Sequence, residues 1–215
     1  MTSTRRAKAA EAPVSPHAPV LSLPPAAVLT YRYELTDFIE LFRFKALRDG
    51  RVNYYYGHRR SGHFSSELEQ IYLTPDGRLN AKQLDILSEA DPDQKQLRQR
   101  TTSARSISCQ LTGIAPEGIR YEFDADAWKR TRHLELPLFQ IILQASEPII
   151  QLRNQVRHEI FTPTDKQRAR PPADKEQSAM VPSWSFYVAG QDDAKDLVSL
   201  LKTIRELMIN STAAA

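Results

Sequence analysis

The sequence of 215 residues predicts an α+β fold, in which an antiparallel sheet packs against a C-terminal amphipathic helix and one or two further helices. Residues 106–112 and 118–124 alternate between apolar and polar side chains, which is the period of a strand with one buried face. Residues 192–209 carry apolar side chains at the three- and four-residue spacing of an amphipathic helix. Nine of the 14 prolines lie in 1–28 and 162–183, which leaves the other segments free to form these elements.

The composition predicts one domain over residues 29–210. Residues 1–28 are rich in proline and alanine and have few large apolar groups, so we expect a disordered tail. Residues 162–183 are predicted to be a flexible insertion, and 211–215 a disordered end. Apolar residues make up 41% of the chain and charged residues 26%, which excludes a wholly disordered protein.

The first elements are a strand near residues 29–35, a helix near 37–48 and a second strand near 51–57. The helix has a capping Thr or Asp before it and a glycine after it. Residues 51–73 match a hairpin. The alternative is a short helix that begins at the capping box of residues 66–69.

A strong turn, Thr-Pro-Asp-Gly at 74–77, precedes a predicted helix near residues 80–90. The polar stretch 94–105 fits a solvated helix or a loop, and the strands near 106–112 and 118–124 follow. Residues 134–161 are dense in apolar and β-branched side chains, which permit either an interrupted buried helix or strands. A last strand is predicted near residues 184–188.

Several classes of protein are excluded or disfavoured. The single cysteine, Cys109, cannot form an intramolecular disulfide, and its place in an alternating strand predicts a buried, inert thiol. No apolar stretch matches a membrane span or a signal peptide, so we expect a cytoplasmic protein with no membrane partner.

No pattern in the chain marks a catalytic or metal site. The five histidines are too scattered to converge on a metal, and the seven glycines form no phosphate loop or dinucleotide fingerprint. The nearest approach to a two-metal nuclease is Asp124-x-Asp126-x-x-Lys129, whose aspartates also fit turn and capping roles. The Asp/Asn-x-Ser-x-x-Gly signature of modules that bind cyclic dinucleotides is missing. We therefore expect no catalytic residues, no metal and no cofactor.

Positive charge is unevenly distributed, although 29 cations against 26 carboxylates give a net charge of only +3. Six cations and one acid lie between Arg43 and His63, around three consecutive tyrosines, and residues 94–106 hold four cations and no acid. Guanidinium groups bind phosphate oxygens in pairs, and aromatic rings stack on bases.

These clusters predict a non-enzymatic, nucleic-acid-binding accessory protein that contacts the phosphate backbone of DNA or RNA. In a strand, Tyr54 and Tyr56 share one face and would form the aromatic platform. The predicted binding residues are Arg51, Tyr54, Tyr56, Arg59, Arg60, Arg98, Arg100 and Arg105. The alternative is a protein-interaction module, either a homo-oligomer or a subunit of a larger assembly. Its evidence is the proline-rich tail, the insertion and the apolar density of residues 134–152.

Overall fold

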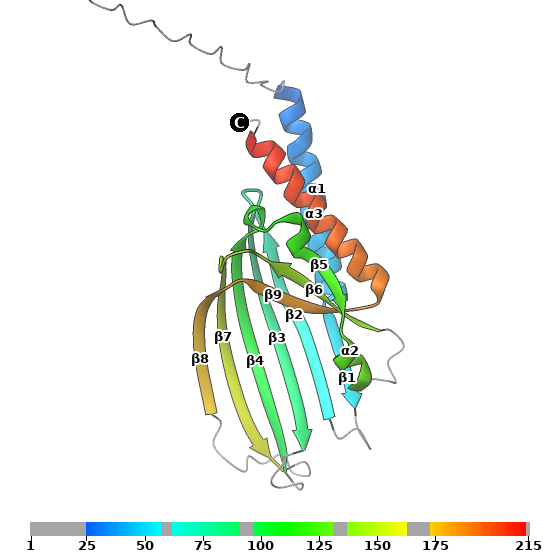
Figure 1. Cartoon of the computed structure of the whole chain (residues 1–215), viewed down its shortest axis with the longest axis vertical. Helices are drawn as coiled ribbons and strands as arrows, with labels where there is room; N and C mark the ends of the chain where they lie inside the picture. The colour runs from blue at the N-terminus through cyan, green and yellow to red at the C-terminus, as the bar shows by residue number, and fades with distance from the viewer. Residues whose placement is uncertain (1–24, 57–61, 91–96, 131–136, 163–172, 214–215) are drawn as a thin grey trace, which may run out of the picture.

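The computed structural model describes residues 25–56, 62–90, 97–130, 137–162 and 173–213. Figure 1 shows a large curved sheet, a smaller sheet whose strand β9 crosses it, and two long helices together at one end. The large sheet has six antiparallel strands in the order β1 (Arg51–Tyr56), β2 (Gly62–Leu73), β3 (Arg78–Ala90), β4 (Arg98–Gln110), β7 (Ile150–Phe161) and β8 (Ala173–Val181). The α+β class is confirmed.

The smaller sheet has three antiparallel strands in the order β5 (Ile119–Phe123), β6 (Leu138–Gln144) and β9 (Ser183–Ala189). The helices are α1 (Pro25–Asp49), the short α2 (Ala125–Arg130) and α3 (Gln191–Ala213). An ion pair of 2.7 Å joins Lys45 of α1 to Asp196 of α3 where the two helices pack together.

Each residue of the large sheet belongs to one of two faces because side chains alternate along a strand. We call the face that packs on the helices and the smaller sheet the inner face; it includes the buried Leu79, Ile107 and Cys109. The opposite face, which includes the exposed Lys82 and Ser106, is the outer face.

The core lies between the inner face, the helices and the smaller sheet. Phe42 of α1, Ile141 of β6 and Leu201 of α3 are each at most 1% exposed and belong to one cluster. Burial lowers the ionisation of Cys109 in the same cluster and raises the pKa of its thiol to about 11. The predicted burial of this cysteine is thus confirmed.

The predicted strand near residues 29–35 is wrong, because these residues belong to α1. Their alternation was weak, and the buried side chains that follow, Leu35, Ile39 and Phe42, have helical spacing. The helix near residues 37–48 is confirmed as the second half of α1. Of the predicted tail, residues 25–28 lie in α1 and residues 1–24 lie outside the described residues.

The predicted helix near residues 80–90 is also wrong, because the segment is strand β3. It pairs with β2 on one side and β4 on the other, and Leu79, Ala81 and Gln83 are buried with a period of two. The hairpin over 51–73 is confirmed by the pairing of β1 with β2, so the capping box at 66–69 forms no helix.

The polar stretch 94–105 belongs to strand β4 from Arg98 onward, since β3 and β7 flank it and satisfy its backbone. The ambiguous segment 134–161 contains strands β6 and β7. Its apolar density is core: Leu138, Ile141 and Ile150 are fully buried and present no partner surface.

The predicted insertion 162–183 contains strand β8 over residues 173–181, and residues 163–172 lie outside the described residues. The strands near 51–57, 106–112, 118–124 and 184–188 and the helix near 192–209 are confirmed. Among the described helices, none combines the length and hydropathy of a membrane span.

Candidate nucleic-acid interface

Strand geometry divides the predicted cations of β4 between the two faces of the large sheet. Arg98 and Arg100 lie on the outer face, opposite Ala90 and Ser88 of β3. Arg105 is an odd number of residues away and therefore lies on the inner face, where its Nη2 is 3.0 Å from Oδ2 of Asp85. The three arginines do not form one patch.

Arg98 and Arg100 retain positive charge that no described carboxylate neutralises through an ion pair. Nη2 of Arg98 donates a hydrogen bond of 3.2 Å to the carbonyl oxygen of Ser88. The guanidinium of Arg100 lies 5.4 Å from the ring centroid of Phe161 on β7. Stacking on a ring orders a guanidinium while leaving its N–H groups available to an anion.

Tyr55 on β1 and His63 on β2 complete this group on the same face, with β3 between these strands and β4. Their ring centroids are 4.6 Å apart, and Tyr55 is 53% exposed. Nε2 of His63 lies 2.7 Å from Oδ1 of Asn53, so in the neutral ring this nitrogen carries the proton and donates. We call these outer-face residues the distal cluster: Tyr55, His63, Arg98, Arg100 and Phe161.

The environment of His63 disfavours the charged form of its imidazole. Burial first, and then the positive charges of Arg100 and Arg98, lower the pKa of His63 below its usual value of 6.5. The arginine contribution shows that positive potential extends over the distal cluster.

We expect the variant Arg98→Gln to raise the pKa of His63, measured by an NMR titration of the imidazole, without restoring 6.5, because burial remains. The folded chain binds this proton at lower pH than the unfolded chain, so stability falls as the pH drops below about 6.5. That loss should be smaller in the variant. Lys195→Gln, on helix α3, is the control. An unchanged or lower His63 pKa in Arg98→Gln would contradict this account.

The tyrosine platform differs from the prediction. Tyr54 is only 4% exposed and packs against Phe64 at a centroid distance of 5.2 Å, because it lies on the inner face of β1. On the outer face of β1 the exposed ring is Tyr55. Arg51 lies on the outer face and pairs with Glu67 at 2.8 Å. Arg59, Arg60 and the side chain of Tyr56 lie outside the described residues.

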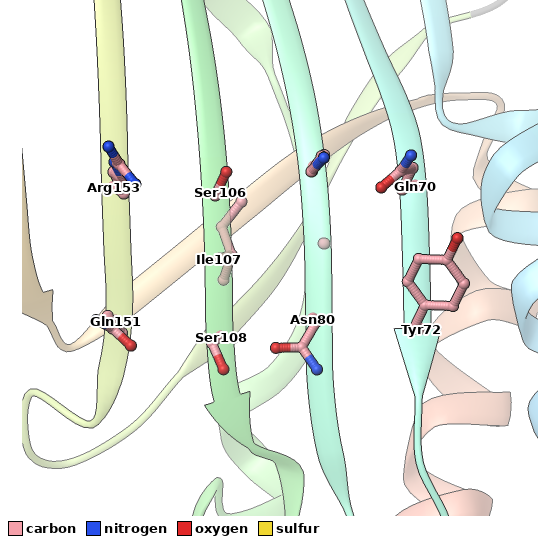
Figure 2. Close-up of a pocket in the computed structure, with 10 residues that line it drawn as sticks. Gln70, Tyr72, Asn80, Ser106, Ile107, Ser108, Gln151 and Arg153 are labelled. Atoms are coloured by element: carbon pink, nitrogen blue, oxygen red, sulfur yellow. The ribbon is translucent and has the colours of Figure 1, made fainter. Parts of the chain in front are cut away.

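A second group of polar side chains surrounds a hollow of about 380 Å³ nearer the helices. Figure 2 shows its side chains on four adjacent strands, β2, β3, β4 and β7. We call this outer-face site the proximal hollow; its polar side chains are Gln70, Tyr72, Asn80, Lys82, Ser106, Ser108, Gln151 and Arg153. The guanidinium of Arg43 on α1 lies 5.2 Å from the ring centroid of Tyr72.

Lys82 is the free cation of the proximal hollow, since it forms no ion pair with any carboxylate in the described ranges. Arg153 by contrast is paired with Glu176 on β8. Lys82 is six positions along β3 from Ser88, which lies beside the distal cluster, a distance of about 20 Å. The outer-face residues between them on β3 are the half-buried Leu84 and Ile86. The outer face therefore has cations and rings at two sites, with two apolar side chains of β3 between them.

Asp124 of the nuclease alternative has a structural role. Oδ1 of Asp124 accepts a hydrogen bond of 2.7 Å from the backbone N–H of Ala127, at the start of α2. Its Oδ2 accepts from Gln140 at 2.9 Å and from Tyr187 at 3.1 Å. Over the described part of the chain, no three His, Cys, Asp or Glu residues gather as metal ligands would.

Comparison with known proteins adds no assignment. No family model, no curated protein and no solved structure matches the chain. The function therefore has to be argued from the two outer-face sites themselves.

The sequence predicted only some of the residues at the two outer-face sites. Arg98 and Arg100 stood out as cations in an acid-free stretch. Lys82 lay in a segment with helical spacing, and His63 lay in an apparent turn. A strand prediction for residues 78–90 would have placed Lys82 beside Ser106, which is its partner in the β3–β4 register.

Proposed function

We propose that this protein binds single-stranded nucleic acid along the outer face of its six-stranded sheet and catalyses no reaction. The proposal rests mainly on Arg98 and Arg100, which share the outer face with exposed Tyr55 and half-buried His63 and form no ion pair with a described carboxylate. Guanidinium groups next to accessible rings can hold a phosphate and a base at the same time.

An unpaired strand suits this surface better than a duplex. Stacking on an aromatic side chain contributes about 1–3 kcal/mol per base, and it requires that the face of the base be accessible. Tyr55 and Tyr72 are both about half exposed and mark the two ends of the surface. A nucleic-acid strand bound at both sites would cross Leu84 and Ile86, which can pack against sugars and bases.

The amide and hydroxyl groups of the proximal hollow add hydrogen-bonding capacity. Gln70, Asn80 and Ser106 offer both donors and acceptors, as base edges and the 2′-hydroxyl of RNA require. Lys82 supplies a mobile cation for the backbone. These groups favour binding of a nucleic-acid strand at several points along its length.

Fluorescence anisotropy with labelled single-stranded DNA, single-stranded RNA and the matching duplex tests the proposal. We expect the full chain to bind the single strands more tightly than the duplex. The affinity should fall with salt, with a log–log slope of about −0.7 for each phosphate contact. Tighter binding of the duplex, or no binding of any of the three, would contradict the proposal.

A second candidate function, self-association, is favoured by edge strand β8. Eight of its nine residues are exposed, and an unpaired strand edge is a template for strand addition. Antiparallel pairing of two copies about Gln177 would place Lys175 opposite Ala179 and Glu176 opposite Ser178, so like charges would not meet. Light scattering over a concentration series tests this candidate. A dimer is expected, and a monomer at every concentration excludes it.

A further inference from the structure

The side chains on the inner face of the large sheet change from apolar to polar along the strands. Near the helices it is apolar, with Leu79 and Ile107 in the core. Toward the other end, where the strands continue past β9 (Figure 1), its side chains include Thr101, Ser103 and Arg105.

Two hollows lie between this polar part of the inner face and the smaller sheet. Their volumes are about 350 and 310 Å³, and both are lined by Arg105 of β4 and Ser185 of β9. The first hollow is also lined by the apolar Phe64 and Leu87 and by Tyr187. Each hollow is as large as the smaller ligand sites of proteins, which begin near 300 Å³. We call the two together the inner groove.

A chain of buried hydrogen bonds holds Arg105 in place. Its Nη2 is paired with Oδ2 of Asp85 at 3.0 Å. The other oxygen, Oδ1, accepts from Oγ of Ser66 at 2.6 Å and from Nε2 of Gln83 at 3.1 Å. Gln83 in turn accepts a bond of 2.9 Å from Nε1 of Trp184 through its Oε1.

This network makes Arg105 a positioned cation. Ser66 and Gln83 are each 2% exposed. Apolar residues in their place would commonly stabilise a fold at least as well as these polar ones do. The network fixes one end of the Arg105 guanidinium. The Arg105 side chain is still 34% exposed, and it lines the groove. Asp85 engages one of its nitrogens, and a guanidinium has five N–H donors.

The other residues that line the first hollow indicate which chemical group the bound anion could carry. Ser185 lines the same hollow as Arg105, and its hydroxyl is a further donor, whereas Oγ of Ser103 donates to Oδ1 of Asn154 at 2.7 Å. Phe64 and Leu87 form an apolar surface, and the ring of Tyr187 contacts Phe64 edge-on at 5.4 Å. The Tyr187 hydroxyl hydrogen-bonds to Asp124, and burial together with that carboxylate raises the Tyr187 pKa to about 12.

We propose that the inner groove binds a small organic anion with a flat apolar body, whose carboxylate, sulfonate or phosphate is held by Arg105 and the Ser185 hydroxyl. The apolar body lies against Phe64, Leu87 and Tyr187. This site is on the opposite face of the sheet from the nucleic-acid interface and does not depend on it.

The proposal is tested with a pair of fluorescent probes, anilinonaphthalene sulfonate and the uncharged phenylnaphthylamine, added to the full chain. We expect saturable binding of one sulfonate per chain. Arg105→Gln should weaken sulfonate binding by about tenfold or more, because a charge-assisted pair is lost, and should change phenylnaphthylamine binding by less than about twofold.

Arg105→Gln leaves Asp85 without its partner, so a second variant avoids the buried network. Ser185→Glu places a carboxylate in the groove and should also weaken binding of the sulfonate. Lys195→Gln on helix α3 is the control and should bind as the wild type does. Near-UV circular dichroism verifies that each variant keeps its packed core.

Three results would overturn the proposal: no saturable binding of the sulfonate, unchanged affinity in both groove variants, or an equal loss in Lys195→Gln. Equal weakening of the charged and uncharged probes would also contradict it, because the recognition would then be apolar only. Nucleic-acid binding measured on the same variants is expected to be unaffected, so failure here is distinguishable from failure of the outer-face proposal.

Discussion

Replacing Arg98 and Arg100 together by glutamine is expected to lower the affinity for single-stranded nucleic acid by roughly ten- to a hundredfold. Both side chains lie on the outer face, and neither forms an ion pair with a described carboxylate. An arriving phosphate therefore does not have to displace a carboxylate. Each guanidinium that is removed takes away one phosphate contact and the counterion release that accompanies it.

The salt dependence gives this prediction its sharpest readout. The slope of log affinity against log salt should become shallower by about 1.4, since each contact with a single strand contributes about 0.7. The same glutamine variants leave the strand pairing of β4 intact, because β3 and β7 bond to its backbone. Thermal unfolding should accordingly change little.

The double variant Lys195→Gln, Lys202→Gln is the matched control, because it removes the same total charge from helix α3. Its affinity and slope should stay close to those of the wild type. If both double variants weaken binding equally, net charge and not the distal cluster determines the affinity. If neither weakens it, the outer face is not the binding surface.

Replacing Phe42 by alanine is expected to reduce the free energy of unfolding by about 3–5 kcal/mol. The Phe42 side chain is 1% exposed and lies in the main core cluster between α1 and the large sheet. Its removal takes apolar surface out of the core and leaves a cavity that the surrounding strands cannot fill without distortion. Chemical denaturation at equilibrium measures the loss.

Phe44 is the control for this prediction, two residues along the same helix. It is 64% exposed, with the guanidinium of Arg48 at 5.8 Å from its ring, so Phe44→Ala should change stability by at most about 0.5 kcal/mol. Residues two apart share a face in a strand but lie on different faces of a helix. Equal losses for the two variants would therefore contradict the helical structure of this segment.

Local patterns predicted those elements in which one face is apolar and the other is polar. Strand β5, the last part of β4 and helix α3 have such patterns, and all three were predicted near their observed positions. The first half of α1 and strand β3 were assigned wrongly. In β3, Leu84, Ile86 and Leu87 face both sides of the sheet, so their spacing resembles a helix.

The sequence predicted which cations belong to the candidate interface better than it predicted their arrangement in space. The acid-free stretch pointed to Arg98 and Arg100, and the three tyrosines pointed to β1. The local pattern of β1 does not show which of its faces is covered, and so the prediction chose the face of Tyr54, which is buried, while Tyr55 on the other face is exposed. Phe161 joins the cluster only through the pairing of β7 with β4.

By itself the sequence determined the α+β class, the burial of Cys109 and the richness of β4 in cations, because each depends on side chains within a few residues of one another. The tertiary structure alone decided that the helices and the smaller sheet cover the face of Arg105 and leave the face of Arg98 and Arg100 uncovered. It also decided that Asp85, Gln83 and Trp184 meet behind Arg105. The reason is physical: the covered face of a strand depends on which distant elements pack against it, and the local pattern is the same for either choice.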